Sequence, residues 1–369
     1  MAHQSTAAVR ELARLLDDVA DAYETRTEID AVDGLRNVMH LFTSATEHIL
    51  EADAERPYFT RIVSPVRKFL GDNPDAIYYW ARIRGDRSYR IVGRRGGETY
   101  TSFTVHARDP RGGALERVTA DVNDRALQID ADGRYEIVLS ATPHEGNWIP
   151  LDADATTIIT RHYFARESSA AADPDVHISL RIEPLDDPGP PPRLDDAALA
   201  ERLRALGAWV RAESIGRRPA TSVPSFVSVV PNELPQPASF RATGVEAWGA
   251  VDIYYASAKF DLGPNDALII DGKMPRCAFA NVMLWTSNMQ TLEYRYRQTS
   301  LNNVQLRTSP DGSFRVVVAH EDPGVPNWLD TEGRPNGTIF WRFLLPDEQP
   351  APFTCRVVPL ADVRAGNFG

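Results

Sequence analysis

Hydrophobic residues in the first fifty positions recur at helical spacing. Leu12 and Leu15 lie on one face of a helix predicted over residues 5–24, and a second helix is predicted over 34–52. A third helix, over 195–214, follows a stretch rich in aspartate and proline. These three segments are the only ones whose pattern indicates a helix.

From about residue 76 the pattern changes to short runs in which aromatic and β-branched residues alternate with polar ones. Gly, Asp or Pro separates the runs, which is typical of antiparallel strands joined by hairpins. The predicted strands are AIYYWARI, SYRIVGR, ETYTSFTVHA, RYEIVLS, TTIITRHYF and VHISLRIEPL before the third helix, and VDIYYASAKF, CAFANVMLWT, FRVVVAH, GTIFWRFLL and FTCRVVPL after it.

The two groups of strands can be aligned on each other. Residues 122–139 match residues 301–318 without a gap, and similar features recur before and after this stretch. The matched pairs are Asn123 with Asn302, Leu127 with Leu306, Tyr135 with Phe314, Tyr78-Tyr79 with Tyr254-Tyr255, Trp148 with Trp328 and Arg161 with Arg342. So many matches in one order predict an internal repeat.

The fold class predicted from these patterns is mainly β with accessory helices. Two tandem antiparallel β-sandwich units, jelly-roll-like and related by internal duplication, are each preceded by helix. The predicted segments are a helical part over 1–59, a first β repeat over 60–185, a proline-rich linker with a helix over 186–240, and a second β repeat over 241–369.

Composition and charge narrow the range of partners. The net charge of −11 disfavours nucleic acid, whose phosphates require a basic surface. No apolar run reaches the roughly 20 residues that span a bilayer. The N-terminus does not resemble a secretion signal and the chain has 2 cysteines, so we expect a cytoplasmic protein. Homo-oligomer formation is left open.

A His-Glu pair followed by Asn-Trp occurs in both repeats. In the first repeat His144 and Glu145 are candidate acid–base catalysts, because imidazole and carboxylate can exchange protons near neutral pH. Neighbouring side chains on a strand point to opposite faces, so the pair alone does not predict a metal site. The alternative interpretation is an exposed polar loop at the end of a strand.

Three further residues of the first repeat are candidate ligand contacts. Asn147 and Trp148 could form a platform for a sugar ring or a flat apolar molecule, and Arg161 could bind an anion. Because each of the three recurs in the second repeat, a structural role is favoured. Tryptophan would then cap the core, asparagine would bond its own turn, and arginine would bond nearby carbonyls.

The stretch GDNPDAIYY is polar in the first repeat only. Asp72 and Asp75 are therefore candidate catalytic carboxylates, and with Asn73 they could ligate a divalent cation through oxygen. Tyr78 and Arg82 follow on the next strand as candidate ligand contacts. No cofactor is predicted. The alternative is a turn before a strand, which Asn-Pro-Asp commonly forms.

The chain resembles a bacterial family known as the domain of unknown function twelve-fourteen. The stretches that carry the likeness are RIVSPVRKFLGDNPDAIYYWARIRGDRSYRIVGRRGGETYTSFTVHARD, DADGRYEIVL and GNWIPLDADATTIITRHYF, over roughly residues 60–170. The resemblance implies an antiparallel β-sandwich or jelly roll without a settled activity or agreed catalytic residues. It also implies a bacterial context near lipid, steroid or terpenoid metabolism.

Two hypotheses for function follow. The first is an enzyme of accessory or secondary metabolism that acts on a small, largely apolar molecule, such as a terpenoid, a steroid or a glycosylated compound. Its pocket would lie in the first repeat and use acid–base or cation-stabilising chemistry. The second is a non-catalytic ligand-binding or scaffolding module. An enzyme predicts polar groups gathered in one repeat, whereas a module predicts matching surfaces in both.

Overall fold

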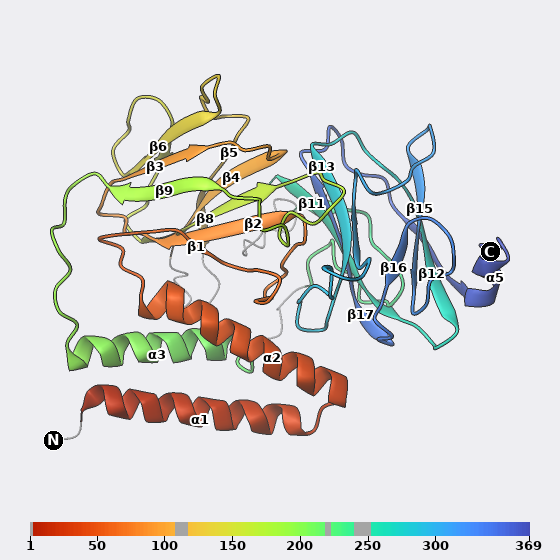
Figure 1. The fold of residues 1–369 in the computed structure, drawn as a ribbon, viewed down its shortest axis with the longest axis horizontal. Coiled ribbons are helices and arrows are strands. Elements are labelled where there is room, and N and C mark those ends of the chain that lie inside the picture. Colours follow the sequence, from red (N-terminus) through yellow and green to blue (C-terminus); the bar gives the residue numbers. More distant parts are fainter. Residues whose placement is uncertain (1–2, 108–116, 218–222, 240–251) are drawn as a thin grey trace.

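The computed structural model describes residues 3–107, 117–217, 223–239 and 252–369 (Figure 1). The three predicted helices are confirmed with small differences at their ends. The helices are α1 (Gln4–Glu24), α2 (Glu28–Ala45), which continues as the π-helix η1 (Thr46–Leu50), α3 (Asp196–Glu213) and the short α5 (Leu360–Arg364). No helix of the described ranges is both long and apolar enough to cross a membrane.

The first half of the chain forms two sheets packed face to face. The larger has the strand order β1-β2-β8-β4-β5 and the smaller the order β7-β6-β3-β9. The strands are β1 (Thr60–Arg61), β2 (Ala76–Arg82), β3 (Tyr89–Arg94), β4 (Tyr100–Ala107), β5 (Arg117–Asn123), β6 (Arg134–Ser140), β7 (Trp148–Pro150), β8 (Ala155–Tyr163) and β9 (Ser179–Pro184).

The second half repeats this arrangement. Its larger sheet has the order β10-β11-β17-β13-β14 and its smaller sheet the order β16-β15-β12-β18. The strands are β10 (Ala238–Ser239), β11 (Ile253–Asp261), β12 (Asp266–Lys273), β13 (Phe279–Trp285), β14 (Ser300–Asn302), β15 (Ser313–Ala319), β16 (Trp328–Asp330), β17 (Asn336–Leu344) and β18 (Thr354–Pro359).

The identical strand order confirms the internal duplication. Trp148 and Trp328 hold equivalent places, because each begins a short strand that pairs in parallel with β6 or β15. The alignment of Tyr78 with Tyr254 is wrong by one residue. Tyr78 pairs with Arg161 and Tyr255 pairs with Arg342, so Tyr78 corresponds to Tyr255.

Two full-length strands, β5 and β12, are missing from the predicted runs. In β12 four successive residues are buried, Ala267 to Ile270, so the strand has no polar–apolar alternation to reveal it. The predicted boundaries of the four segments stay predictions. The proposed start of the second repeat, at residue 241, lies outside the described residues.

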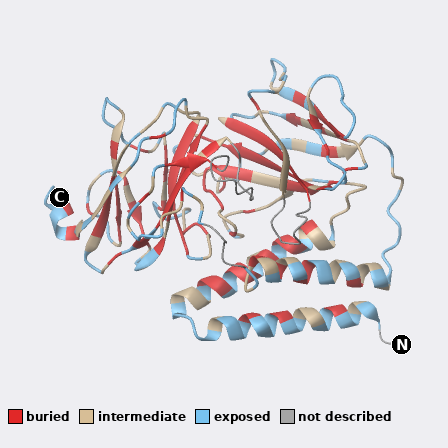
Figure 2. Ribbon diagram, turned by 180° about the vertical axis from the view of Figure 1, so that it is seen from behind, coloured by how far each residue is buried: buried red, intermediate tan, exposed pale blue. Residues whose placement is uncertain are grey.

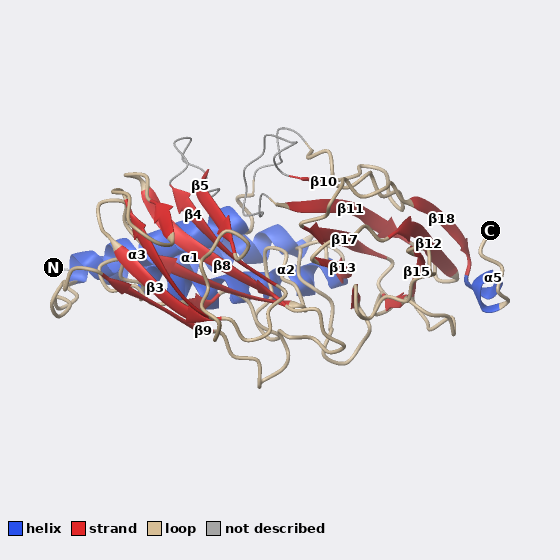
Figure 3. Cartoon of the chain, turned by 90° about the horizontal axis from the view of Figure 1, so that it is seen from above, coloured by secondary structure: helices blue, strands red, loops and turns tan. Residues whose placement is uncertain are grey.

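Each half encloses its own apolar core, and the helices cover one side of the larger sheet of the first half (Figure 2). Leu15, Val38 and Val210 of the three helices pack with Trp80 and Ile159 of that sheet. The helix α2 also reaches the second half, where Asp33 forms an ion pair with Arg334 (Figure 3). The helices therefore connect the two halves as well as covering one of them.

The two halves hold each other through equivalent aspartates. Asp75 precedes β2, and its carboxylate accepts hydrogen bonds from Asn281 (2.9 Å) and Asn302 (2.9 Å) of the second half. Asp252 precedes β11, and its carboxylate accepts one from Asn123 (2.7 Å) of the first half. Since Asn123 and Asn302 are themselves equivalent, the contact is reciprocal, as in a twofold-symmetric dimer.

This contact predicts that Asp75→Asn destabilises the protein by about 1–3 kcal/mol, because an amide NH2 group would then face two other amide donors. Adding Asn302→Asp restores an acceptor opposite the new amide and should recover part of the loss. Chemical unfolding followed by tryptophan fluorescence measures both effects.

The matched control combines Asp75→Asn with Asn123→Asp. This second change places a carboxylate beside Asp252 instead of beside residue 75, so it should lower stability further. Equal recovery in both double variants would contradict the reciprocal contact.

Candidate functional site

The polar residues of the first half gather on the face of its larger sheet that points away from the sandwich core. Residues paired directly across neighbouring strands point to the same face. The pairing gives three rows on this face: Tyr78, Arg161, Ser102 and Asn123; Trp80, Ile159, Thr104 and Asp121; and Arg82, Thr157 and His106. We call these residues the polar face.

The equivalent face of the second half is also mostly polar, but two polar residues of β4 are replaced there by apolar ones. Met283 stands where the first half has Thr104, Trp285 where it has His106, and Phe340 where it has Ile159. Trp285 and Phe340 stack with ring centroids 4.2 Å apart. Thr104 and His106 are therefore polar residues of this face that the second copy lacks, and the fold that both copies share does not require them.

Hydrogen bonds connect the polar face across three strands. Arg161 donates to the hydroxyl of Thr104 (2.5 Å), and Thr104 donates to the carboxylate of Asp121 (2.5 Å). In the third row Arg82 donates to the hydroxyl of Thr157 (3.1 Å). Thr104, His106 and Thr157 are fully buried, so these bonds form away from solvent, where they are strongest.

Tyrosines border the polar face on the side of the second half. Tyr78 donates to the hydroxyl of Tyr163 (3.2 Å), and Tyr100 donates to Asp252 (2.8 Å). Burial raises the pKa of both Tyr78 and Tyr100 well above the usual value, and the Asp252 carboxylate raises that of Tyr100 further. Both phenols therefore stay protonated near neutral pH and act as hydrogen-bond donors.

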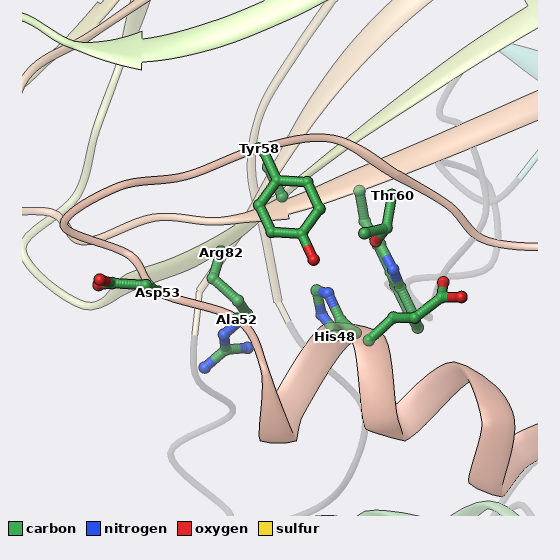
Figure 4. Close-up of a pocket in the computed structure, with 9 residues that line it drawn as sticks. His48, Ala52, Asp53, Tyr58, Thr60 and Arg82 are labelled. Atoms are coloured by element: carbon green, nitrogen blue, oxygen red, sulfur yellow. The ribbon is translucent and has the colours of Figure 1, made fainter. Parts of the chain in front are cut away.

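A small cavity of about 10 Å³ lies at the other end, where η1 meets the sheet (Figure 4). His48 stacks on Trp80, with ring centroids 3.6 Å apart, and Arg82 lines the cavity beside it. The hydroxyl of Tyr58 points toward the imidazole of His48, whereas Asp53 points away. Burial, followed by the charge of Arg82, lowers the pKa of His48, so its ring is neutral near pH 7.

Of the residues predicted from sequence, Tyr78, Arg82 and Arg161 lie together on the polar face. Asp72 and Asp75 do not. Asp72 accepts hydrogen bonds from the backbone and hydroxyl of Thr291 in the second half, and Asp75 belongs to the reciprocal contact between the halves. Both side chains are used in joining the halves.

The oxygen atoms proposed to ligate a divalent cation already accept hydrogen bonds. Asn73 accepts from Asn281 (2.8 Å) and from the backbone of Asp75 (2.9 Å), and all four carboxylate oxygens of Asp72 and Asp75 also accept. A cation there would have to displace these donors. No group of three or more His, Cys, Asp or Glu within the described part of the chain is placed to hold a metal.

His144, Glu145 and Asn147 line a different feature, a surface groove of about 420 Å³ over the outer side of the smaller sheet. His144 and Glu145 are exposed. The groove and the small cavity share no lining residue, so the predicted set of His144, Glu145, Asp72 and Asp75 does not form one pocket.

Asn147 and Trp148 make structural contacts, but different ones from those predicted: Asn147 bonds a distant segment instead of its own turn, and Trp148 lies outside the sandwich core. Asn147 bonds the backbone of Gln128 (2.7 and 2.9 Å), and Asn327 bonds that of Arg307 (2.8 and 2.8 Å) in the same way. The indoles of Trp148 and Trp328 donate to the carbonyls of Ser140 and Ala319, the last residues of β6 and β15. The same residues therefore fix the same loop in both halves.

Sequence reasoning missed most of the polar face. The missed polar residues are Ser102, Thr104, His106, Asp121, Asn123 and Thr157, and His48 beside the face was missed as well. A signal was present in the alignment of the repeats, which places Thr104 on Met283 and His106 on Trp285. A comparison of the two repeats that searched for positions polar in one and apolar in the other would have selected Thr104 and His106.

These features define a duplicated β-sandwich protein in which one copy has two buried polar residues, Thr104 and His106, at positions that are apolar in the other. The sequence model of the family described as "Protein of unknown function (DUF1214)" matches residues 80–167 and 269–348, one region in each half. A crystal structure of a Burkholderia cenocepacia protein is similar over 96% of this chain and 97% of its own, with 31% identity and a TM-score of 0.83. The chain belongs to the DUF1214 family.

A second solved structure, the VPA0106 protein of Vibrio parahaemolyticus, aligns over 89% of this chain and 99% of its own, with 12% identity and a TM-score of 0.49. No curated protein matches the chain.

We expect Asn147→Asp and Asn327→Asp each to destabilise the protein by about 1–3 kcal/mol, because a carboxylate cannot donate to the two carbonyls that the amide NH2 group now bonds. Thermal or chemical unfolding measures the loss. His144→Ala, in the same loop but exposed, is the control and should change stability by less than about 0.5 kcal/mol. Unequal losses at the two asparagines would contradict their equivalent role.

The carboxyl of Asp75 gives a pH dependence. Burial raises its pKa from 3.8 to about 6, so its contribution to stability is complete below pH 3.8 and is lost as the pH rises through about 6. The stability of the wild type relative to Asp75→Asn should therefore fall by up to about 3 kcal/mol between about pH 4 and about pH 7. Urea unfolding across this range tests the sign, and a difference that grows with pH would contradict it.

Proposed function

We propose that this protein is an enzyme of accessory metabolism whose substrate binds at the polar face of the first half. The observation that carries the proposal is that the buried Thr104 and His106 of the first half stand where the second half has Met283 and Trp285. Buried polar groups cost free energy unless they are satisfied, so a fold that is complete without them has little structural reason to keep them.

The surroundings favour a small, largely apolar substrate with a polar group, such as a terpenoid, a steroid or a glycosylated compound. Trp80, Tyr78 and Tyr163 supply apolar surface, while Arg161 and Arg82 supply hydrogen-bond donors for a polar group. The cavity beside Trp80 and Arg82 is about 10 Å³, the size of one water, so binding of such a substrate requires η1 to move away from the sheet.

The residues divide into acid–base and orienting roles. His106 is the imidazole of the polar face and is assigned the acid–base role, because its ring nitrogens can both accept and donate a proton. The carboxylate of Asp121 can stabilise positive charge that develops on the substrate, and Thr104 and Arg161 hold it in place. Tyr78 remains a donor, since its pKa is raised.

The test is a thermal-shift screen against terpenoids, steroids and their glycosides, followed by mass spectrometry of mixtures incubated with the protein. A bound compound should raise the melting temperature by about 2 °C or more at saturating concentration. Arg161→Gln should remove this shift and any turnover. The equivalent change in the second half, Arg342→Gln, is the matched control and should lower the melting temperature of the free protein but preserve the shift.

Loss of the ligand-induced shift in both variants would contradict a site in the first half alone. Compounds that bind with the expected dependence on Arg161 but are recovered unchanged would support the alternative function, a non-catalytic ligand-binding module.

A further inference from the structure

A second polar layer lies inside the first sandwich, on the opposite side of the same sheet. Thr160 and His162 point from β8 toward the core, and Thr101 of β4 pairs directly with His162. Their equivalents in the second half are Trp341, Phe343 and Ala280, all buried and apolar. Glu98, which is 5% exposed, completes the layer and corresponds to Cys277.

The side chains of this layer form an incomplete hydrogen-bonded series. The hydroxyl of Thr160 lies 3.0 Å from Nε2 of His162. On the other side of the ring, Nδ1 of His162 lies 3.8 Å from Oε1 of Glu98, which is too long for a hydrogen bond. Neither Nδ1 of His162 nor Oγ1 of Thr101 has a hydrogen-bond partner among the described residues. His162 is fully buried and Thr101 is 1% exposed.

Unsatisfied polar atoms in a core are costly, and most buried polar groups in folded proteins have a partner. A gap of 3.8 Å is too wide for a direct bond and suits a bridging water, since two bonds of about 2.8 Å can meet across it. Thr101, the cross-strand neighbour of His162, is the third side chain of this layer with an unpaired polar atom to offer, and three partners are the usual number for an internal water.

We propose that the first sandwich binds one water molecule between His162 Nδ1, Glu98 Oε1 and Thr101 Oγ1, and that this water joins Thr160, His162 and Glu98 into one hydrogen-bonded chain. The acceptor-only carboxylate of Glu98 takes one hydrogen of the water. Within the described residues the hydroxyl of Thr160 has His162 as its only hydrogen-bond partner, so Thr160 donates to Nε2 and the water accepts from Nδ1–H of His162. The imidazole is therefore neutral with its proton on Nδ1.

This site is separate from the polar face but shares its strand. Arg161 lies between Thr160 and His162 in sequence and points to the other side of the sheet. The chain of bonds fixes β8 from the inside and so positions the backbone that carries Arg161.

A crystal structure of the full chain with ordered waters resolved is the direct test. We expect density for one water within about 3.2 Å of all three atoms. A structure of that quality without such a peak would overturn the proposal.

Nitrogen-15 NMR of histidine-labelled protein tests the bond directions independently, because protonated and unprotonated ring nitrogens differ widely in chemical shift. We expect the Nδ1–H form for His162 in the wild type and in Glu98→Gln, whose amide oxygen can still accept. Glu98→Leu and Thr160→Val should each shift the population toward the Nε2–H form. Arg161→Gln is the control and should leave His162 unchanged, so this test does not depend on the proposed function. A wild-type His162 protonated on Nε2 would overturn the proposal.

Discussion

Successive side chains of a β-strand point to opposite faces, and in the larger sheet of the first half both faces are buried. One face of β4 and β8 points into the sandwich, and the other meets the helices and the second half. Every polar residue of these strands must therefore find its partner within the protein. β4 carries threonine, serine and histidine, yet all 8 of its residues are buried.

In the second half the strand equivalent to β4 is also buried on both faces. This strand, β13, is mostly apolar, so its side chains need packing and few hydrogen bonds. The one polar side chain there, Asn281, is used to bond Asp75 of the first half. Duplication thus provides an internal reference, in which the second copy indicates what the fold needs and the first copy indicates what has been added.

The sequence predicted the repeat, the three long helices and most of the strands, because periodicity and matched positions are local properties. It failed where the structure depends on contacts between the halves. Asp72 and Asp75 were selected because polar residues before one strand only suggested a divergent site. Their partners Thr291 and Asn302 lie more than 200 residues away, and no local pattern reveals that a turn crosses to the other half. Asp75 also has a counterpart, Asp252, which a one-residue error in the alignment concealed.

Correctly aligned repeats separate polar residues that support the fold from polar residues that are candidates for a site. Asp75 and Asp252 are equivalent residues with the same role, whereas His106 and Trp285 are equivalent positions with opposite chemistry. Polar groups that recur in both copies, including Asn147 and Asn327, hold the architecture together. Polar groups in only one copy carry a desolvation cost that the other copy avoids, and they lie on both sides of β8. Because side chains alternate along a strand, the internal histidine layer and the polar face share the backbone of β8 while facing opposite sides of the sheet.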